Sequence, residues 1–143
     1  MIHLENLCRH FEVGNQIVRA LDEVDLEIDK NEYVSIMGVS GSGKSTLLNI
    51  LGLLDTPTSG SYVLSGVNTS KMNDDEMAHI RSTKIGFIFQ SFHLIPRLTA
   101  AENVEMPMIL SGLNPKERKE KTDMALARVS LTDRSDHRPE QLS

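Results

Sequence analysis

The residues with the clearest chemical meaning lie in one stretch, Gly38-Val39-Ser40-Gly41-Ser42-Gly43-Lys44-Ser45-Thr46. Its spacing fits G-x-x-x-x-G-K-S/T, the pattern of a phosphate-binding loop. Glycines let the backbone take positive φ and approach a ligand closely, so that successive N–H groups can surround an anion. We expect Lys44 to reach the β- and γ-phosphates of a nucleotide and the Ser45 hydroxyl to ligate Mg²⁺. The other predicted phosphate-binding residues are Gly38, Ser40, Gly41, Ser42, Gly43 and Thr46.

The segments on either side of the loop suit this chemistry. Tyr33–Met37 is a short apolar run that predicts a strand, and Thr46–Leu51 predicts a helix. The first N–H groups of such a helix and the positive end of its dipole would face the same anion. A glycine-rich turn before an ordinary helix is the alternative, and the strand–loop–helix context argues against it.

The first 30 residues predict a small antiparallel sheet, because apolar and polar residues alternate around turn signals. The turn is expected at Gly14-Asn15, and later turn residues bound a further strand at Ser61–Leu64. The predicted strands of the sheet are 2–11, Gln16–Leu21 and Val24–Asp29.

Beyond that strand the sequence predicts one buried strand and three helix starts. Lys84–Phe89 is the buried-strand candidate, and it ends at Gln90. The three helices should begin after Asn73, Thr99 and Asn114, since each is an N-cap residue with a glutamate three positions on.

Composition narrows the class of protein. Of 143 residues, 39% are hydrophobic and 24% are charged, which is typical of a globular protein. The net charge of −5 gives no basic footprint for nucleic acid. No apolar run approaches the ~18 residues of a membrane span, and no signal peptide is evident, so we expect a cytoplasmic chain. The single cysteine, Cys8, is expected to be structural, and no group of His, Cys and carboxylate residues has metal-ligand spacing along the chain.

Four features in one order carry a family resemblance: Phe11, the phosphate loop, Phe89-Gln90, and Arg138-Pro139-Glu140-Gln141-Leu142-Ser143. Together they resemble the nucleotide-binding domain of an ABC transporter. The stretch from Gly86 to Val104 is especially similar to the macrolide-export and lipoprotein-release group. The resemblance implies an α/β fold: a P-loop NTPase core with an N-terminal antiparallel β subdomain and the beginning of a helical subdomain. The three parts are expected at 1–30, 31–90 and 91–143, with the C-terminal part of the core missing.

The resemblance also implies roles for single residues. Phe11 stands where the family has an aromatic residue, usually Tyr, that stacks on adenine. Gln90 resembles the glutamine that contacts Mg²⁺ and the attacking water, so Lys44 and Gln90 are the expected catalytic residues, with Mg²⁺ at Ser45 and Gln90. Leu142 and Ser143 match the start of the signature Leu-Ser-Gly-Gly-Gln, whose serine binds the γ-phosphate of ATP held by a partner subunit.

The implied partners are transmembrane permease subunits and a second copy of the domain in a head-to-tail dimer. The protein would lie on the inner face of the cell membrane through those permeases. The family's later elements are absent from these residues: the signature glycines, the Walker B aspartate, the catalytic glutamate and a histidine. The intact parent would hydrolyse ATP to ADP and phosphate, whereas this chain is expected to bind ATP but hydrolyse it poorly. Ile85–Phe89 should expose apolar surface, because the strands that would cover it are missing.

Three other readings stay open. A soluble ABC-type ATPase of DNA repair or translation would have no transport role, but the repair type requires a long coiled coil, and Pro107 and Pro115 argue against one. A small P-loop kinase or GTPase would need neither Phe11 nor Gln90. The last reading is a non-functional truncated remnant.

Overall fold

The chain begins with one long β-hairpin in the computed structural model, which describes residues 1–90 and 93–142. Strand β1 (Ile2–Val13) pairs antiparallel with β2 (Gln16–Ile28). The predicted turn at Gly14-Asn15 is confirmed, and Gly14 has φ 60°, a conformation that glycine adopts freely. The two strands predicted at 16–21 and 24–29 form one continuous strand, which is bulged where Glu23 has φ 50°.

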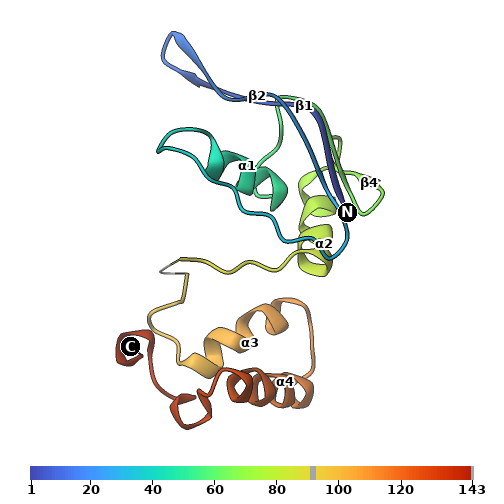
Figure 1. The fold of residues 1–143 in the computed structure, drawn as a ribbon. Coiled ribbons are helices and arrows are strands. Elements are labelled where there is room, and N and C mark those ends of the chain that lie inside the picture. The colour runs from blue at the N-terminus through green and yellow to red at the C-terminus, as the bar shows by residue number, and fades with distance from the viewer. Residues whose placement is uncertain (91–92, 143) are drawn as a thin grey trace. The chain divides into compact units, whose positions relative to one another are not determined.

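The hairpin belongs to a four-stranded antiparallel sheet of order β2-β1-β3-β4. Strand β3 (Ser59–Leu64) pairs with the first part of β1, up to Cys8, and β4 (Val67–Asn68) pairs with β3. Beyond Cys8, β1 pairs with β2, and the hairpin extends past the rest of the sheet, as Figure 1 shows.

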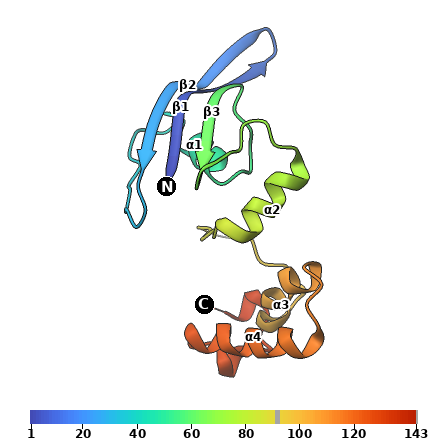
Figure 2. The same ribbon diagram turned by 90° about the vertical axis from the view of Figure 1, so that its right-hand side faces the viewer.

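Two helices supply the rest of this unit: α1 (Lys44–Leu51) and α2 (Asp74–Lys84). Helix α1 lies behind the sheet in Figure 2. Side chains from the sheet, α1, α2 and the turn after α1 share one apolar core. Its buried members are Leu4, Leu7, Leu21, Ile50, Leu53, Tyr62, Leu64 and Met77.

The helix starts follow the predicted caps. Asn73 accepts from the Glu76 N–H at 2.9 Å and its own N–H donates to the Glu76 carboxylate at 2.9 Å. Thr99 and Glu102 form the same reciprocal pair at 3.2 and 2.7 Å. These bonds satisfy N–H groups that a helix start leaves without an intrahelical partner, so local sequence alone determines where the helices begin.

The two predicted core strands are wrong as descriptions of this structure. Residues 33–37 and 85–89 are extended segments without strand pairing among the described residues. Their apolar side chains are largely exposed: Tyr33 to 94%, Met37 to 87% and Ile88 to 102%. A buried parallel strand needs neighbours on its edges, and no described segment supplies them. The expected exposure of apolar surface at Ile85–Phe89 is thus observed.

The C-terminal residues form a helical unit. Helix α3 (Ala100–Leu110) and α4 (Pro115–Arg128) pack against each other and are followed by short 3-10 helices η1 (Thr132–Arg134) and η2 (Pro139–Gln141). The helix α3 continues through Pro107. Backbone N–H groups of Ala100 and Ala101 donate to carbonyls of His137 and Ser135, which ties the start of α3 to the segment after α4.

The contacts divide the chain into two units, Met1–Ile88 and Phe89–Ser143. The three parts expected from the sequence, at 1–30, 31–90 and 91–143, stay a prediction. Among the helices of the described residues, none has the length and apolarity that a bilayer crossing requires.

Tyr62 offers a test of the core. It is fully buried, its hydroxyl donates to the Leu51 carbonyl at 2.8 Å, and burial raises its pKa to about 12. Because the folded pKa lies above the unfolded value of about 10, this contribution to stability is complete below pH 10 and is lost as the pH rises toward 12. In a Tyr33→Phe variant, which keeps one tyrosine, tyrosinate absorbance should develop close to 12. A midpoint near 10 with the fold intact would contradict this environment.

Candidate functional site

The phosphate loop leads directly into α1 and is shaped by glycines. Gly41 has φ 81° and Gly43 has φ 87°, both in the left-handed region that favours glycine. A Cβ added at Gly43 would collide with the carbonyl oxygen of Ala20 on β2, so the loop lies directly against that strand. The sequence requirement for glycine at 43 therefore has two causes, backbone conformation and close packing.

Lys44 places its ammonium group inside the loop. Its Nζ donates to the carbonyl oxygens of Gly38 at 2.8 Å and Val39 at 2.6 Å, and lies 3.5 Å from Ser42 Oγ. An ammonium group has three donors and no acceptor. These bonds hold a positive charge at the mouth of the loop, where phosphate oxygens could replace the carbonyl oxygens as acceptors.

The N-terminus of α1 adds backbone donors at the same place. Gly43 is the N-cap residue, no described side chain caps the helix, and its first turn contains no acidic residue. The first N–H groups of the helix and the positive end of its dipole are thus left for an external anion. Ser45 and Thr46, the second and third residues of α1, carry hydroxyls at this end.

A cavity of about 530 Å³ joins the loop to β2. It contains most of the predicted phosphate-binding residues, while Gly38 and Ser42 contact Lys44 from within the loop. The β2 wall of the cavity, formed by Val18, Arg19 and Ala20, was not predicted from the sequence, because it depends on how the hairpin closes over the loop. The lining residues are Val18, Arg19, Ala20, Ser40, Gly41, Gly43, Lys44, Ser45 and Thr46.

Phe11 lies next to this cavity on β1, directly opposite Val18. The guanidinium carbon of Arg9 lies 4.5 Å from the centroid of the Phe11 ring, which is a cation–π contact. Phe11 itself is 36% exposed. Arg9 is held in turn by Asp55 through two contacts of 2.8 Å, from Nε to Oδ2 and from Nη2 to Oδ1. Such a bidentate pair fixes the guanidinium plane, so the ring is supported from one side.

The two remaining predicted site residues, Gln90 and Ser143, do not belong to the first unit. Gln90 lies in the second unit, in an exposed bend. Ser143 lies outside the described residues. Their roles toward nucleotide and Mg²⁺ stay predictions.

The predicted ligands fit a magnesium-bound triphosphate by their chemistry. Mg²⁺ takes oxygen ligands and is held by one or two protein groups plus phosphates, and the exposed Ser45 provides a hydroxyl at the cavity wall. Lys44 and Arg19 bring positive charge to a chain of net charge −5. The local arrangement can therefore attract a polyanion that the whole chain would repel.

Comparison with known proteins agrees with this geometry. The family model described as ABC transporter matches residues 21–143. An uncharacterized ABC transporter ATP-binding protein, YknY of Bacillus subtilis, is 51% identical over the whole chain, which spans 62% of that relative. The macrolide export ATP-binding/permease protein MacB of Burkholderia pseudomallei is also 51% identical, and the chain spans 22% of it.

Solved structures show the same fold. The dimeric post-hydrolysis structure of the ATP-binding cassette MJ0796, bound to ADP and Pi, superimposes with a TM-score of 0.89 at 45% identity. The match includes all of this chain and 63% of the MJ0796 chain. The chain thus has the α/β fold of these cassettes but spans less than two thirds of the cassette. Its sequence, its fold and its glycine loop agree with those expected of an ABC cassette. The chain belongs to the ABC transporter family as part of an ATP-binding domain.

Proposed function

We propose that this chain binds the triphosphate of ATP, with Mg²⁺, as part of an ABC-type ATPase. The observation that carries the proposal is the position of Lys44 Nζ, held within 2.8 Å of two loop carbonyls beside the uncapped start of α1. Phosphate oxygens could replace these two carbonyls as acceptors with little movement of the ammonium group, and the first N–H groups of α1 point to the same anion.

Each residue has a stated task in this proposal. Lys44 donates to the β- and γ-phosphate oxygens and Ser45 gives its hydroxyl to Mg²⁺, which neutralises charge on the phosphates when bound. Phe11 stacks on adenine with Arg9 behind it. Gln90 senses the γ-phosphate and orients water, and Ser143 contributes to the ATP of a partner copy.

Hydrolysis of ATP to ADP and phosphate is proposed for the intact parent. Phosphoryl transfer depends on positioned charges and an oriented water more than on covalent chemistry of the protein. The 143 residues contain neither the Walker B aspartate nor the catalytic glutamate that the family would place after the signature. We therefore expect this chain to bind ATP and to hydrolyse it poorly.

The parent is proposed to drive export or lipoprotein release through permease subunits at the inner face of the membrane. MacB is named as a macrolide export protein, and the MJ0796 cassette is a dimer, which supports a transport role and pairing with a second copy. We propose that the two copies pair head to tail. The short helices α3 and α4, of 11 and 14 residues, do not support the long coiled coil of a repair-type ATPase.

Displacement of a fluorescent ATP analogue from the chain, in the presence of Mg²⁺, tests nucleotide binding. ATP and ADP should displace it, and AMP should not, because the loop binds phosphates beyond the first. Phe11→Ala should lower the affinity for ATP about 5-fold, because ~1 kcal/mol of stacking is lost. Phe11→Tyr should bind ATP as the unsubstituted chain does. Equal displacement by AMP and ATP would contradict the proposed use of the loop.

A further inference from the structure

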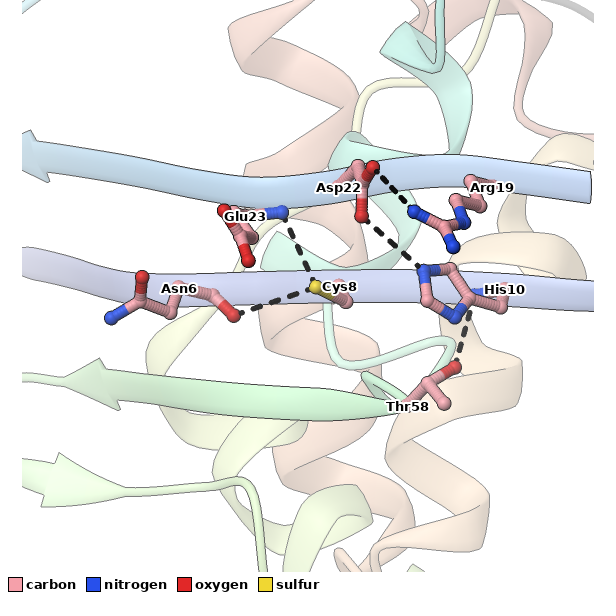
Figure 3. A network of polar contacts seen from close by, with 7 residues as sticks. All are labelled: Asn6, Cys8, His10, Arg19, Asp22, Glu23 and Thr58. Carbon is pink, nitrogen blue, oxygen red and sulfur yellow. Dashed lines mark hydrogen bonds and ion pairs between the residues drawn. The ribbon is translucent and has the colours of Figure 1, made fainter.

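A group of three potential metal ligands lies on the β1–β2 hairpin, apart from the phosphate loop. Cys8 and His10 lie two positions apart on β1, and Asp22 faces them from β2, as Figure 3 shows. A thiol sulfur, an imidazole nitrogen and a carboxylate oxygen from these residues all lie within 4.8 Å of one another. Spacing along the chain did not predict this group, because its members come together only through the pairing of two strands.

Irregularities in both strands create this arrangement. Asn6 has φ 47° and Glu23 has φ 50°, and the register between the strands shifts on both sides of Cys8. The Glu23 N–H donates to Cys8 Sγ at 3.2 Å. The Cys8 thiol itself donates to the Asn6 carbonyl oxygen at 3.7 Å, and it would release this proton on binding a metal ion.

The other two side chains are oriented toward the same point. Asp22 Oδ2 accepts from Arg19 Nη1 at 3.2 Å, while its Oδ1 lies 3.6 Å from His10 Nε2. That separation is too long for a hydrogen bond. His10 Nε2 is buried and has no hydrogen-bond partner among the described residues. Buried polar atoms usually have a hydrogen-bond partner, so this imidazole nitrogen, which lies beside a thiol and a carboxylate, is available to ligate a metal ion.

We propose that Cys8, His10 and Asp22 bind a zinc-type divalent transition-metal ion. Sulfur, imidazole nitrogen and carboxylate oxygen are the three zinc ligand types, and three protein ligands leave a fourth position for water. Zinc lies about 2.0–2.3 Å from such ligands, so ligand atoms of one ion are ~3–4 Å apart. The observed spacing of at most 4.8 Å needs only small side-chain rotations to close.

The surroundings provide the outer contacts of such a site. Arg19 holds the second oxygen of Asp22 and also lines the phosphate-loop cavity, and His10 precedes Phe11. Groups that orient ligands from outside raise metal affinity. A bound ion would connect β1 to β2 beside the nucleotide cavity without using any residue of the phosphate loop.

Titration of the protein with Co²⁺, in a buffer free of chelators and containing a non-thiol reductant, tests the site. Cobalt bound to a thiolate gives a near-ultraviolet charge-transfer band, and in this chain Cys8 is the one cysteine. The band should saturate at one equivalent, disappear on addition of Zn²⁺ and persist in excess Mg²⁺. Absence of the band would overturn the proposal.

Variants locate the ligands. Cys8→Ser should abolish the band. His10→Gln and Asp22→Asn should each lower the affinity for Co²⁺ at least about 10-fold. Asp22 has a half-exposed side chain, so Asp22→Asn tests the site even if Cys8→Ser fails to fold. His3→Gln changes an exposed histidine of the same strand and should bind as the parent does. Unchanged affinity in Asp22→Asn, or a band retained in Cys8→Ser, would show that the group is only a polar cluster.

Discussion

Lys44→Ala should reduce the affinity of the chain for Mg²⁺-bound ATP by about 10- to 100-fold. The substitution removes an ammonium group that donates to the loop carbonyls at 2.6 and 2.8 Å and that we expect to donate to phosphate. A hydrogen bond from a charged group contributes about 1.5–3 kcal/mol, which corresponds to this range. Equilibrium binding of a fluorescent ATP analogue measures the change directly.

The matched control for this prediction is Lys71→Ala. It removes the same charge from an exposed position of the same unit, outside the cavity. If both variants lose affinity equally, the effect is one of net charge and not of the loop. The carbonyls that Lys44 contacts are exposed, so water can replace the lost ammonium group. Lys44→Ala should therefore change the free energy of unfolding, measured from the urea midpoint, no more than an ordinary surface substitution does.

Gly43→Ala should both unfold the first unit more easily and weaken nucleotide binding. A non-glycine residue at φ 87° costs about 1–2 kcal/mol, and its Cβ would also collide with the Ala20 carbonyl oxygen. We expect a total loss of about 2–4 kcal/mol in the free energy of unfolding, because the loop must move away from β2. Urea denaturation measures the first effect and analogue binding the second.

Two other glycines separate the causes. Gly41 has φ 81° but nothing within 4 Å of an added Cβ, so Gly41→Ala should show the cost of backbone strain alone. Gly86 has open space and no positive φ, so Gly86→Ala should change stability little. The account predicts the order Gly43, then Gly41, then Gly86. Equal losses at Gly43 and Gly41 would mean that contact with β2 is unimportant.

Elements determined by local interactions were predictable from the sequence. The hairpin turn at Gly14-Asn15 and the caps at Asn73 and Thr99 depend on residues within four positions of one another. The glycine loop before α1 was predictable for the same reason. Its conformation depends on its own glycines and on the helix that follows.

Features that depend on distant partners were not predictable. The apolar segments 33–37 and 85–89 have the composition of buried parallel strands, yet strand formation requires neighbours that no described segment provides. The bulge at Glu23 lies inside β2, where the sequence predicted two separate strands. Together with the bulge at Asn6 it brings Cys8 toward Asp22. Neither bulge has a glycine or proline to signal it, so the β2 wall and the metal-ligand group appear only in the structure.

Measurement of both ATP binding and ATP turnover on one sample is the strongest test of the proposed function. We propose that these 143 residues, which span 62% of the YknY relative, hold the phosphate-binding part of an ATPase site. The account predicts saturable binding of Mg²⁺-bound ATP, with phosphate release far below the ~1–100 s⁻¹ typical of phosphoryl-transfer enzymes such as kinases. Phosphate release at that ordinary rate, or the absence of saturable ATP binding, would contradict it.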